Sequence, residues 1–309
     1  MPEITLQELN ELSKAPARTV ASAEENYHTK IARAADGVIA RGTRAVLLAG
    51  PSGAGKTTTA NLLADAIRER GHGGLVISLD DFYLDSADPR YPRFPDGSRN
   101  MECAEALDLD AVRETLGNIL DGRPFSVPKY DFRLAARTDV TAYPALTDGC
   151  VIIEGLHALN PKIAGEVSTT ALLRLFVSVS TNIVNSEGKR LLSGRKLRFV
   201  RRLVRDSLYR GATVMHTLAL WRQVLAGEDA YLYPYKGTAE LAFDTFHSFE
   251  PGVMRPFAER VMTEESLKDP YMREVADALA LISPIPDTLV PETSLIREFI
   301  PGGKYEALY

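Results

Sequence analysis

Eight residues near the N-terminal end of the chain have types and a spacing suited to holding phosphate. Glycines let such a segment curl until its backbone N–H groups converge on phosphate oxygens, and a helix after it points its positive end at the anion. Lys56 would reach the β- and γ-phosphates, and Thr57 would offer a hydroxyl to Mg²⁺. The segment therefore predicts a site for ATP with Mg²⁺. It matches G-x-x-x-x-G-K-[ST] in full: Gly50-Pro51-Ser52-Gly53-Ala54-Gly55-Lys56-Thr57.

The residues around this motif supply the context that it requires. Ala45–Ala49 is a short apolar run that favours a buried parallel strand, and residues 56–70 have a helical pattern that Gly71 is placed to end. An ordinary glycine-rich turn is the alternative, and the flanking strand and helix make it weak. The chain has no Asn-Lys-x-Asp element, which disfavours a guanine-selective switch protein.

Three acidic residues follow other apolar runs. Asp80 and Asp81 come directly after residues 75–79, and Glu154 follows residues 151–153. Ligands of open α/β sheets lie beyond the carboxyl ends of the strands, so one acid can orient Mg²⁺ and another can accept the proton of an attacking hydroxyl. The plain alternatives are a turn or helix cap at the aspartates and a solvated strand end at Glu154.

Residues 195–210 concentrate arginine. Arg198, Arg201, Arg202 and Arg205 are spaced i, i+3, i+4 and i+7, so they share one face of a helix. A solvated basic face is the ordinary explanation of such a run. Acids are sparse here although the chain carries a net charge of −5. We therefore favour a lid that closes over the triphosphate and stabilises the charge on the transferring group.

Composition narrows the class of protein. The 309 residues are 45% hydrophobic and 25% charged, as in ordinary globular proteins, and the acidic balance disfavours a nucleic-acid binder. No apolar run reaches the ~18 residues of a membrane span, and the polar, acidic segment 1–14 does not resemble a signal peptide. Two unpaired cysteines fit a reducing cytoplasm. Five scattered histidines form no zinc-like cluster, and His157 is interpreted as structural.

Taken in order, these motifs resemble the phosphoribulokinase/uridine kinase family of P-loop kinases, and bacterial uridine kinase-like proteins most closely. The resemblance covers the chain from about residue 25 to its end. It is specific for the family and far less specific for the substrate. The segments that carry it are GPSGAGKTT (50–58), SLDDFY (78–83), EALD (105–108), PKYDF (128–132), IEGLHAL (153–159), RRLVRD (201–206) and SLIREFI (294–300).

The resemblance implies a role for each candidate residue. Asp80 would be the general base on a nucleoside 5′-hydroxyl, with Lys56 and Arg205 completing the catalytic set. Thr57 and Glu154 would hold Mg²⁺. The acceptor pocket would be lined by Tyr83, Glu102, Tyr130, Phe132 and Arg137. The ATP contacts would come from Gly50, Ser52, Gly53, Ala54, Gly55, Lys56, Thr57, Thr58, Arg198 and Arg202.

Three positions depart from the uridine–cytidine kinase pattern. Ala135 stands where a histidine helps to read the pyrimidine, Glu102 replaces a shorter aspartate, and a lid glutamine is missing around Leu220. These changes leave phosphoryl transfer intact and weaken the case for pyrimidine recognition. We therefore expect uridine and cytidine to be used within about tenfold of each other.

We expect a three-layer α/β P-loop kinase fold with a parallel sheet, a small β-containing acceptor lobe over residues 125–146 and a helical lid. The expected division is a helical extension (1–43), a kinase domain (44–250) and a helical C-terminal extension with a tail (251–309). The expected partner is a small-molecule acceptor, a nucleoside by resemblance, with no nucleic acid or membrane; a homo-oligomer is left open. The alternatives are a kinase of another polyol or sugar phosphate and a non-catalytic ATP-binding regulator.

Overall fold

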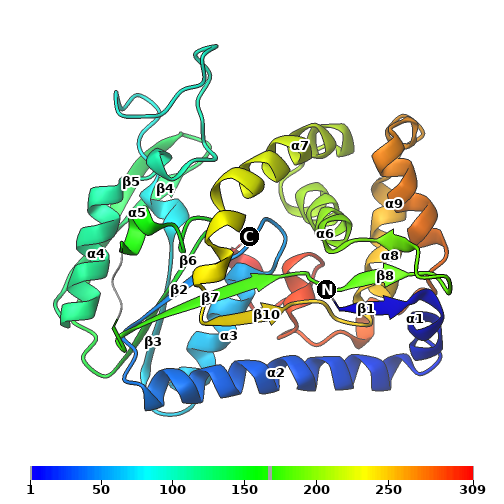
Figure 1. Ribbon diagram of the computed structural model, residues 1–309, viewed down its shortest axis with the longest axis horizontal. Helices are drawn as coiled ribbons and strands as arrows, with labels where there is room; N and C mark the ends of the chain where they lie inside the picture. The colour runs from blue at the N-terminus through cyan, green and yellow to red at the C-terminus, as the bar shows by residue number, and fades with distance from the viewer. Residues whose placement is uncertain (1, 166–168, 309) are drawn as a thin grey trace.

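The protein is built around a five-stranded parallel sheet with strand order β10-β7-β2-β6-β3 (Figure 1). The computed structural model describes residues 2–165 and 169–308. The strand that leads into the phosphate motif is the central one, so the motif opens at the middle of the carboxyl edge. The expected parallel sheet is confirmed. Its strands are β2 (Ala45–Ala49), β3 (Gly73–Ser78), β6 (Gly149–Glu154), β7 (Leu172–Ser178) and β10 (Leu241–Asp244).

Side-chain alternation along β2 explains why this strand is rigid. Val46 and Leu48 point into one hydrophobic core, and Leu47 between them points into the other. All three are fully buried. Full burial of such a side chain is worth about 1.5–3 kcal/mol relative to exposure, so β2 gains stability on both faces. A strand buried on both faces reads as a continuous apolar run, which is why the sequence pattern revealed it.

Helices cover both faces of the sheet, which makes the expected three layers. Side chains of α2 and α3 form one core with the sheet, and those of α4 and α5 form the other. Figure 1 shows the long helix α2 running below the sheet, alongside α3. The bounds are α2 (Pro16–Ala40), α3 (Lys56–Arg68), α4 (Leu109–Asp121) and α5 (Pro161–Ala164).

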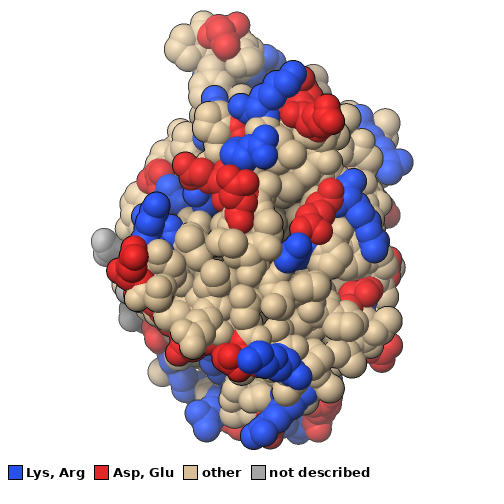
Figure 2. Space-filling model, turned by 90° about the vertical axis from the view of Figure 1, so that its right-hand side faces the viewer, with Lys and Arg blue, Asp and Glu red and all other residues tan. Residues whose placement is uncertain are grey.

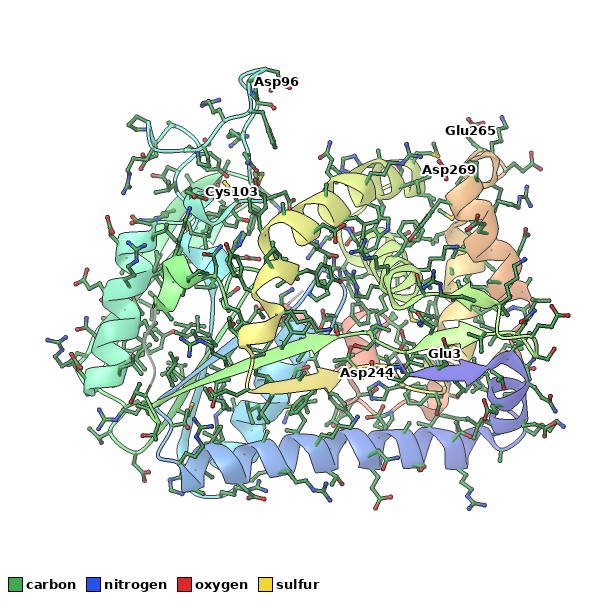
Figure 3. All side chains as sticks on the ribbon, in the orientation of Figure 1. Glu3, Asp96, Cys103, Asp244, Glu265 and Asp269 are labelled. Atoms are coloured by element: carbon green, nitrogen blue, oxygen red, sulfur yellow. The ribbon has the colours of Figure 1, made fainter. Side chains whose placement is uncertain are left out.

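Two segments rise above the carboxyl edge of the sheet. The first is residues 85–100, which contain turns and an isolated bridge between Arg93 and Arg99 but no helix or strand. This loop projects beyond the rest of the chain (Figure 1), with Asp96 at its tip and Cys103 at its base (Figure 3). The second is the expected β excursion, an antiparallel hairpin of β4 (Phe125–Asp131) and β5 (Ala136–Tyr143).

The arginine-rich segment forms a helix, α6 (Gly194–Tyr209), which packs against α7 (Val214–Tyr231). Side-chain caps start both helices: Ser193 accepts from the Lys196 N–H, and Thr213 accepts from the His216 N–H. Such caps satisfy backbone donors that a helix leaves unpaired in its first turn. The two helices lie above the sheet beside the phosphate motif (Figure 1).

The N-terminal strand belongs to a small second sheet of β1 (Glu3–Thr5), β8 (Asn182–Val184) and β9 (Arg190–Leu192). The N-terminal region was expected to be helical, and β1 departs from that expectation because it pairs with β8, a partner distant in sequence. A strand of three residues is too short to show the alternation of apolar and polar residues that would predict a strand from the sequence. The remaining helices are α1 (Leu6–Leu12), α8 (Glu250–Val261) and α9 (Pro270–Ala280).

Surface charge is mixed on the face that carries the second sheet, α1 and α9. Figure 2 shows basic and acidic side chains interspersed there, with no continuous basic stripe. Among residues 2–165 and 169–308, no helix is long and apolar enough to cross a membrane.

Candidate active site

The phosphate motif adopts the curled backbone that its glycines predict. Gly53 and Gly55 have φ angles of 73° and 82°, in the region that side-chain-bearing residues rarely adopt. Gly50 has a different constraint: a Cβ there would lie 2.4 Å from the carbonyl oxygen of Val177. Only glycine therefore fits these three positions. The loop leads into α3 at Lys56, so the helix start faces whatever the loop holds.

The two predicted Mg²⁺ ligands lie together at the carboxyl edge. Glu154 is the last residue of β6, and its Oε1 accepts a hydrogen bond from the Thr57 hydroxyl at 3.4 Å. Burial raises the pKa of Glu154 to about 7, while the positive charge of Lys56 opposes the rise. A hydroxyl and a carboxylate are oxygen donors of the kind that Mg²⁺ prefers, so the pair fits the ion.

A cage of protein ligands is not needed for that ion. Within the described ranges, no group of three or more His, Cys, Asp or Glu side chains could hold a metal by itself. This is the usual arrangement for Mg²⁺ in phosphoryl-transfer sites, where one or two protein ligands act with the substrate phosphates.

Asp80 and Asp81 have different surroundings. Both lie in a 3₁₀ turn, η1 (Leu79–Phe82), which directly follows β3, and not on the strand itself. Lys129 forms an ion pair with Asp81 at 3.0 Å, and the Tyr130 N–H donates to the same carboxylate at 3.4 Å. Asp81 therefore ties the turn to the β4–β5 hairpin.

The Asp80 carboxylate, by contrast, has no hydrogen bond or ion pair to any residue that the structure describes. The residue is open to solvent on one side, and protein atoms surround the carboxylate on the others. The resulting desolvation raises the pKa of Asp80. Lys56 lowers the same pKa and Asp81 raises it, so Asp80 lies within the electrostatic reach of the phosphate motif. A free carboxylate at this place can accept a proton.

A large cavity of about 840 Å³ opens between the loop 85–100 and α7. Tyr83 and the half-buried Glu102 line it, as the resemblance implies. Burial raises the pKa of Glu102, and Arg202 on α6 lowers it. Most other lining side chains are uncharged. They are Phe94, Ser98, Asn100, Met101, Leu220, Gln223, Val224, Ala226, Gly227, Ala230 and Tyr231, with Asp96, Arg99 and Arg202 as the other charged ones.

Tyr130 and Phe132 do not line this cavity but support its wall. Their rings pack against Tyr83 at 5.6 Å each and against each other at 5.0 Å. Ala135 does not line the cavity either, because it lies in the hairpin turn with a φ of 51°. Leu220, near which the resemblance implies a missing lid glutamine, lines the cavity, and so does Gln223 one helical turn later.

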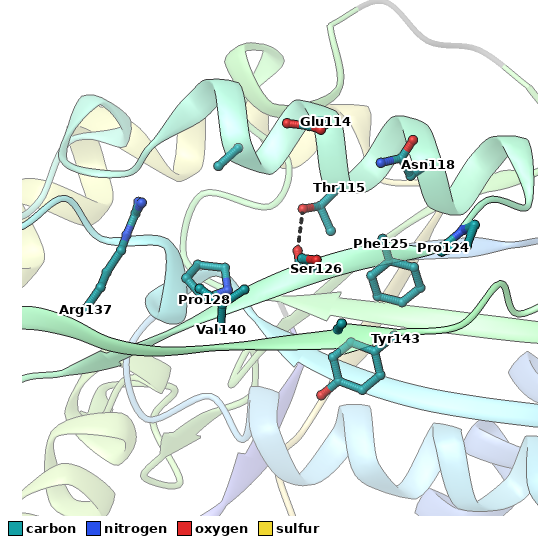
Figure 4. Close-up of a pocket in the computed structure, with 12 residues that line it drawn as sticks. Glu114, Thr115, Asn118, Pro124, Phe125, Ser126, Pro128, Arg137, Val140 and Tyr143 are labelled. Carbon is teal, nitrogen blue, oxygen red and sulfur yellow. Dashed lines mark hydrogen bonds between the residues drawn. The ribbon is translucent and has the colours of Figure 1, made fainter.

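Arg137 lies in a different groove. This cavity, of about 420 Å³, lies between α4 and the hairpin, with Arg137 at one end and the Thr115–Ser126 hydrogen bond across it (Figure 4). The Arg137 guanidinium donates to Asp108 at 3.2 Å and to the carbonyls of Phe82 and Tyr83 at 3.1 Å. These contacts fix the 3₁₀ turn that carries Asp80. A direct contact of Arg137 with the acceptor stays a prediction.

The arginine face of α6 is not a solvated surface. Arg198 is 1% exposed and makes a two-pronged ion pair with Glu228, at 2.7 Å from each nitrogen. Arg201 is fully buried and pairs in the same way with Glu250, at 2.6 and 2.7 Å. A buried charge without its partner is costly, so each arginine requires its glutamate. The solvated-face alternative is therefore wrong for these residues.

These two arginines brace the phosphate motif from its protein side. Arg198 donates to the Ser52 carbonyl at 2.7 Å, and Arg201 donates to the Gly53 carbonyl at 3.1 Å. Glu228 closes the arrangement by accepting from the Ser52 N–H at 2.9 Å. All of these donors and acceptors are occupied by protein groups. The assignment of Arg198 to ATP itself stays a prediction.

A second arginine cluster carries excess positive charge. Arg202, Arg205 and Arg210 all approach the single carboxylate of Asp206, at 3.1, 2.9 and 3.5 Å. Arg202 also donates to the Ser52 hydroxyl at 3.0 Å, which places the cluster beside the motif. Desolvation lowers the pKa of Arg202 and of Arg210, and the charge of Arg205 adds to both effects. Three cations around one acid favour a further anion, such as a triphosphate.

His157 is buried behind the site with its ring against Tyr231, and desolvation lowers its pKa to about 4. A histidine that stays neutral near pH 7 and packs on an aromatic ring fits the structural interpretation.

Sequence reasoning missed several residues of the site because their partners are distant in sequence. Glu228, Glu250 and Glu298 reach the motif or its arginines from other elements. Nothing in the sequence around Glu228 or Glu250 marks them, and the SLIREFI segment does not reveal the partner of its Glu298. An arginine face with few local acids nevertheless predicts distant ones.

Comparison with known proteins identifies the family. The sequence model of the phosphoribulokinase/uridine kinase family matches residues 46–249, and the chain belongs to that family. A uridine kinase of Deinococcus deserti is 30% identical over 167 residues, covering 54% of this chain and 70% of the relative. A uridine kinase of Staphylococcus aureus is 26% identical over 203 residues, covering 65% and 87%.

Solved structures are similar at lower identity. A putative fructose transport system kinase from a Silicibacter species has a TM-score of 0.49 at 21% identity and covers 69% of this chain and 98% of its own. A possible uridine kinase from Bacillus stearothermophilus has a TM-score of 0.42 at 18% identity, with 65% and 88% covered. Phosphoribulokinase from Rhodobacter spheroides has a TM-score of 0.41 at 17% identity, with 66% and 70% covered.

Proposed function

We propose that this protein transfers the γ-phosphoryl group of ATP to a hydroxyl of a small molecule, with the 5′-hydroxyl of a nucleoside as the first candidate. The observation that carries the proposal is the free carboxylate of Asp80. It lies between the phosphate motif, whose Lys56 acts on its charge, and the turn that continues into Tyr83 at the cavity wall. Membership of a family of kinases and the uridine kinase relatives support the same activity.

Each residue of the site then has a chemical task. The acceptor lies in the cavity with its hydroxyl toward Asp80, and Glu102 accepts hydrogen bonds from other hydroxyls. Asp80 takes the proton as the acceptor oxygen bonds to the γ-phosphorus and the bond from that phosphorus to the bridging oxygen of ADP breaks. Bound ATP supplies the phosphoryl group, and Mg²⁺ neutralises its oxygens. Thr57 and Glu154 would hold the ion.

Positive charge on the protein supports this step. Lys56 and the cluster of Arg202, Arg205 and Arg210 place fixed cations around the phosphate motif. Such groups accelerate transfer to the extent that they bind the developing charge more strongly than the ground state. Asp80 is not neutralised by any of them through a direct ion pair within the described residues, so it remains available as the base.

A phosphorylated acceptor is the second candidate. Four arginines of the loop and the hairpin could bind a phosphate, namely Arg90, Arg93, Arg99 and Arg133. Of these, Arg99 lines the cavity, and Arg202 from α6 lines it as well. Arg90 pairs with Asp88, and Arg93 donates to the Gly97 carbonyl. The cavity therefore offers two cations to a sugar phosphate, and this observation favours a phosphoribulokinase-like acceptor as the rival.

An acceptor screen distinguishes the candidates. Uridine, cytidine, purine nucleosides, free polyols and sugar phosphates are each incubated with MgATP, ADP release is measured, and the product mass is determined. We expect nucleosides to be phosphorylated and 2′-deoxynucleosides to react more slowly, because Glu102 loses a hydroxyl partner. Reaction with sugar phosphates alone would replace the nucleoside proposal. ATP turnover that no acceptor changes would favour a regulator that only binds ATP.

A further inference from the structure

A C-terminal segment packs against the start of the phosphate-motif helix. Residues 294–299, which include the 3₁₀ turn η6 (Leu295–Glu298), lie outside the region matched by the family model. They are almost entirely buried, and η6 contacts α3. In Figure 1 this red segment lies beside α3 rather than extending into solvent. We call residues 294–299 the tail segment.

Glu298 provides the first connection to the motif. Its side chain is 6% exposed, and its Oε2 accepts from the Thr58 hydroxyl at 2.9 Å and from the Thr58 N–H at 3.4 Å. Thr58 is the third residue of α3, immediately after the Lys56–Thr57 pair of the motif. The Glu298 carboxylate therefore contacts the first turn of α3 through both the backbone and the side chain of Thr58.

Two apolar residues provide the other connections. Leu295 fills the space beside Gly55, because a Cβ there would lie 2.6 to 2.7 Å from the leucine side chain. The ring of Phe299 lies 5.1 Å below the guanidinium of Arg201, which in turn donates to the Gly53 carbonyl. The tail segment thus contacts the loop at both of its left-handed glycines, directly at one and through Arg201 at the other.

The tail segment is itself anchored on both sides. Ser294 donates to Glu24 on α2, and residues beyond the segment, Lys304 and Tyr305, each contact Asp65 of α3 at 2.6 Å. These anchors restrict the freedom of the intervening turn. Glu298 is therefore presented to Thr58 by a fixed piece of chain.

We propose that the tail segment is a working part of the nucleotide site, in which Glu298 is a positioning residue that holds the start of α3 in its phosphate-binding conformation. This inference rests on the proposed function, because it concerns the same ATP site. Glu298 does not touch the reacting atoms in this account. It acts through Thr58 on the N–H groups and side chains of the adjacent Lys56 and Thr57.

The test compares two neutral replacements of Glu298. Glu298→Gln keeps an oxygen that can accept from Thr58, and Glu298→Ala removes it, so a difference between them reports the hydrogen bond and not the charge. Glu292→Ala, at an exposed position just before the tail segment, is the matched control. The MgATP dissociation constant of the full chain is measured by calorimetry. The kcat and both KM values are measured by ADP release, and Tm is measured by thermal unfolding without nucleotide.

We expect Glu298→Ala to bind MgATP about tenfold more weakly than Glu298→Gln and to have a lower kcat, with the acceptor KM unchanged. Thr58→Val removes the donor from the other side and should reproduce the loss, which covers the case in which Glu298→Ala fails to fold. Equal ATP affinity and kcat in the alanine and glutamine variants, with only Tm differing, would overturn the inference. Failure of the parent itself to bind ATP would overturn the proposed function as well.

Discussion

Replacing Gly227 with alanine should separate stability from acceptor use. Gly227 lies in α7 and faces Glu102: a Cβ would approach the Glu102 Oε2 at 2.8 Å, its Cβ at 3.0 Å and its Cγ at 3.1 Å. Rotation of the carboxylate alone cannot relieve contacts with Cβ and Cγ. The Glu102 side chain must therefore shift as a whole, away from the position in which it lines the cavity between the loop 85–100 and α7.

The substitution should change the free energy of unfolding only slightly, but it should lower kcat/KM for the acceptor. Alanine in a helix interior is worth about 0.5–1 kcal/mol more than glycine, so the substitution should leave the free energy of unfolding within ~1 kcal/mol of the parent. Glu102 would hold acceptor hydroxyls through charge-assisted hydrogen bonds, each worth about 1.5–3 kcal/mol. Weakening one of them should lower kcat/KM for the acceptor by about 10- to 100-fold.

Steady-state kinetics with varied acceptor, calorimetry with MgATP and urea unfolding check this prediction. Gly117→Ala is the control, since Gly117 lies in α4 with nothing within 4 Å of its missing Cβ. It should show the helix stabilisation and no kinetic change. Unchanged acceptor kcat/KM in Gly227→Ala, with ATP affinity also unchanged, would refute the role given to Glu102.

Three further predictions concern charge. Asp80→Asn should lower kcat by roughly 10²–10⁴, whereas Asp81→Asn should mainly lower Tm because it loses the Lys129 ion pair; the reverse order in kinetics would transfer the base role to Asp81. Arg205→Ala should reduce kcat more than ATP affinity, and a change in the KM for ATP alone would indicate a ground-state contact. Burial raises the pKa of Glu24 from 4.5 to about 7, so its protonated form favours folding below pH 4.5 and that stability is lost as pH rises through 7. Glu24→Gln should therefore make the protein more stable at pH 8 by up to about 3 kcal/mol, measured by urea unfolding, while the exposed Glu25→Gln should not.

Much of the fold could be predicted from the sequence because short local patterns determine it. The strand before the motif is buried on both faces and so reads as an unbroken apolar run, and the glycines of the loop are required by their φ angles and by the close approach of Val177. Glu154 ends a strand, as the apolar run before it predicts. The SLIREFI segment contributes to the family resemblance, but nothing in its residues predicts that it reaches Thr58.

The rest depended on contacts between distant elements. The spacing of the α6 arginines fixes their common face but cannot show that Glu228 and Glu250, 30 and 49 residues further on, neutralise two of them in the interior. The apolar run before Asp80 and Asp81 indicates a strand end, but it cannot show that a 3₁₀ turn sets the directions of their side chains. The contacts of Asp81 with the hairpin still leave Asp80 as the free acid.

Transfer of labelled phosphate tests the central claim most directly. ATP labelled in its γ-phosphate is incubated with uridine and the parent protein, and the label is followed into nucleoside monophosphate and into inorganic phosphate. The account predicts label in the monophosphate with the parent, and loss of most of that signal in both Lys56→Ala and Asp80→Asn while each variant keeps the parental fold. Label that appears only as inorganic phosphate, at a rate that no acceptor changes, would contradict it.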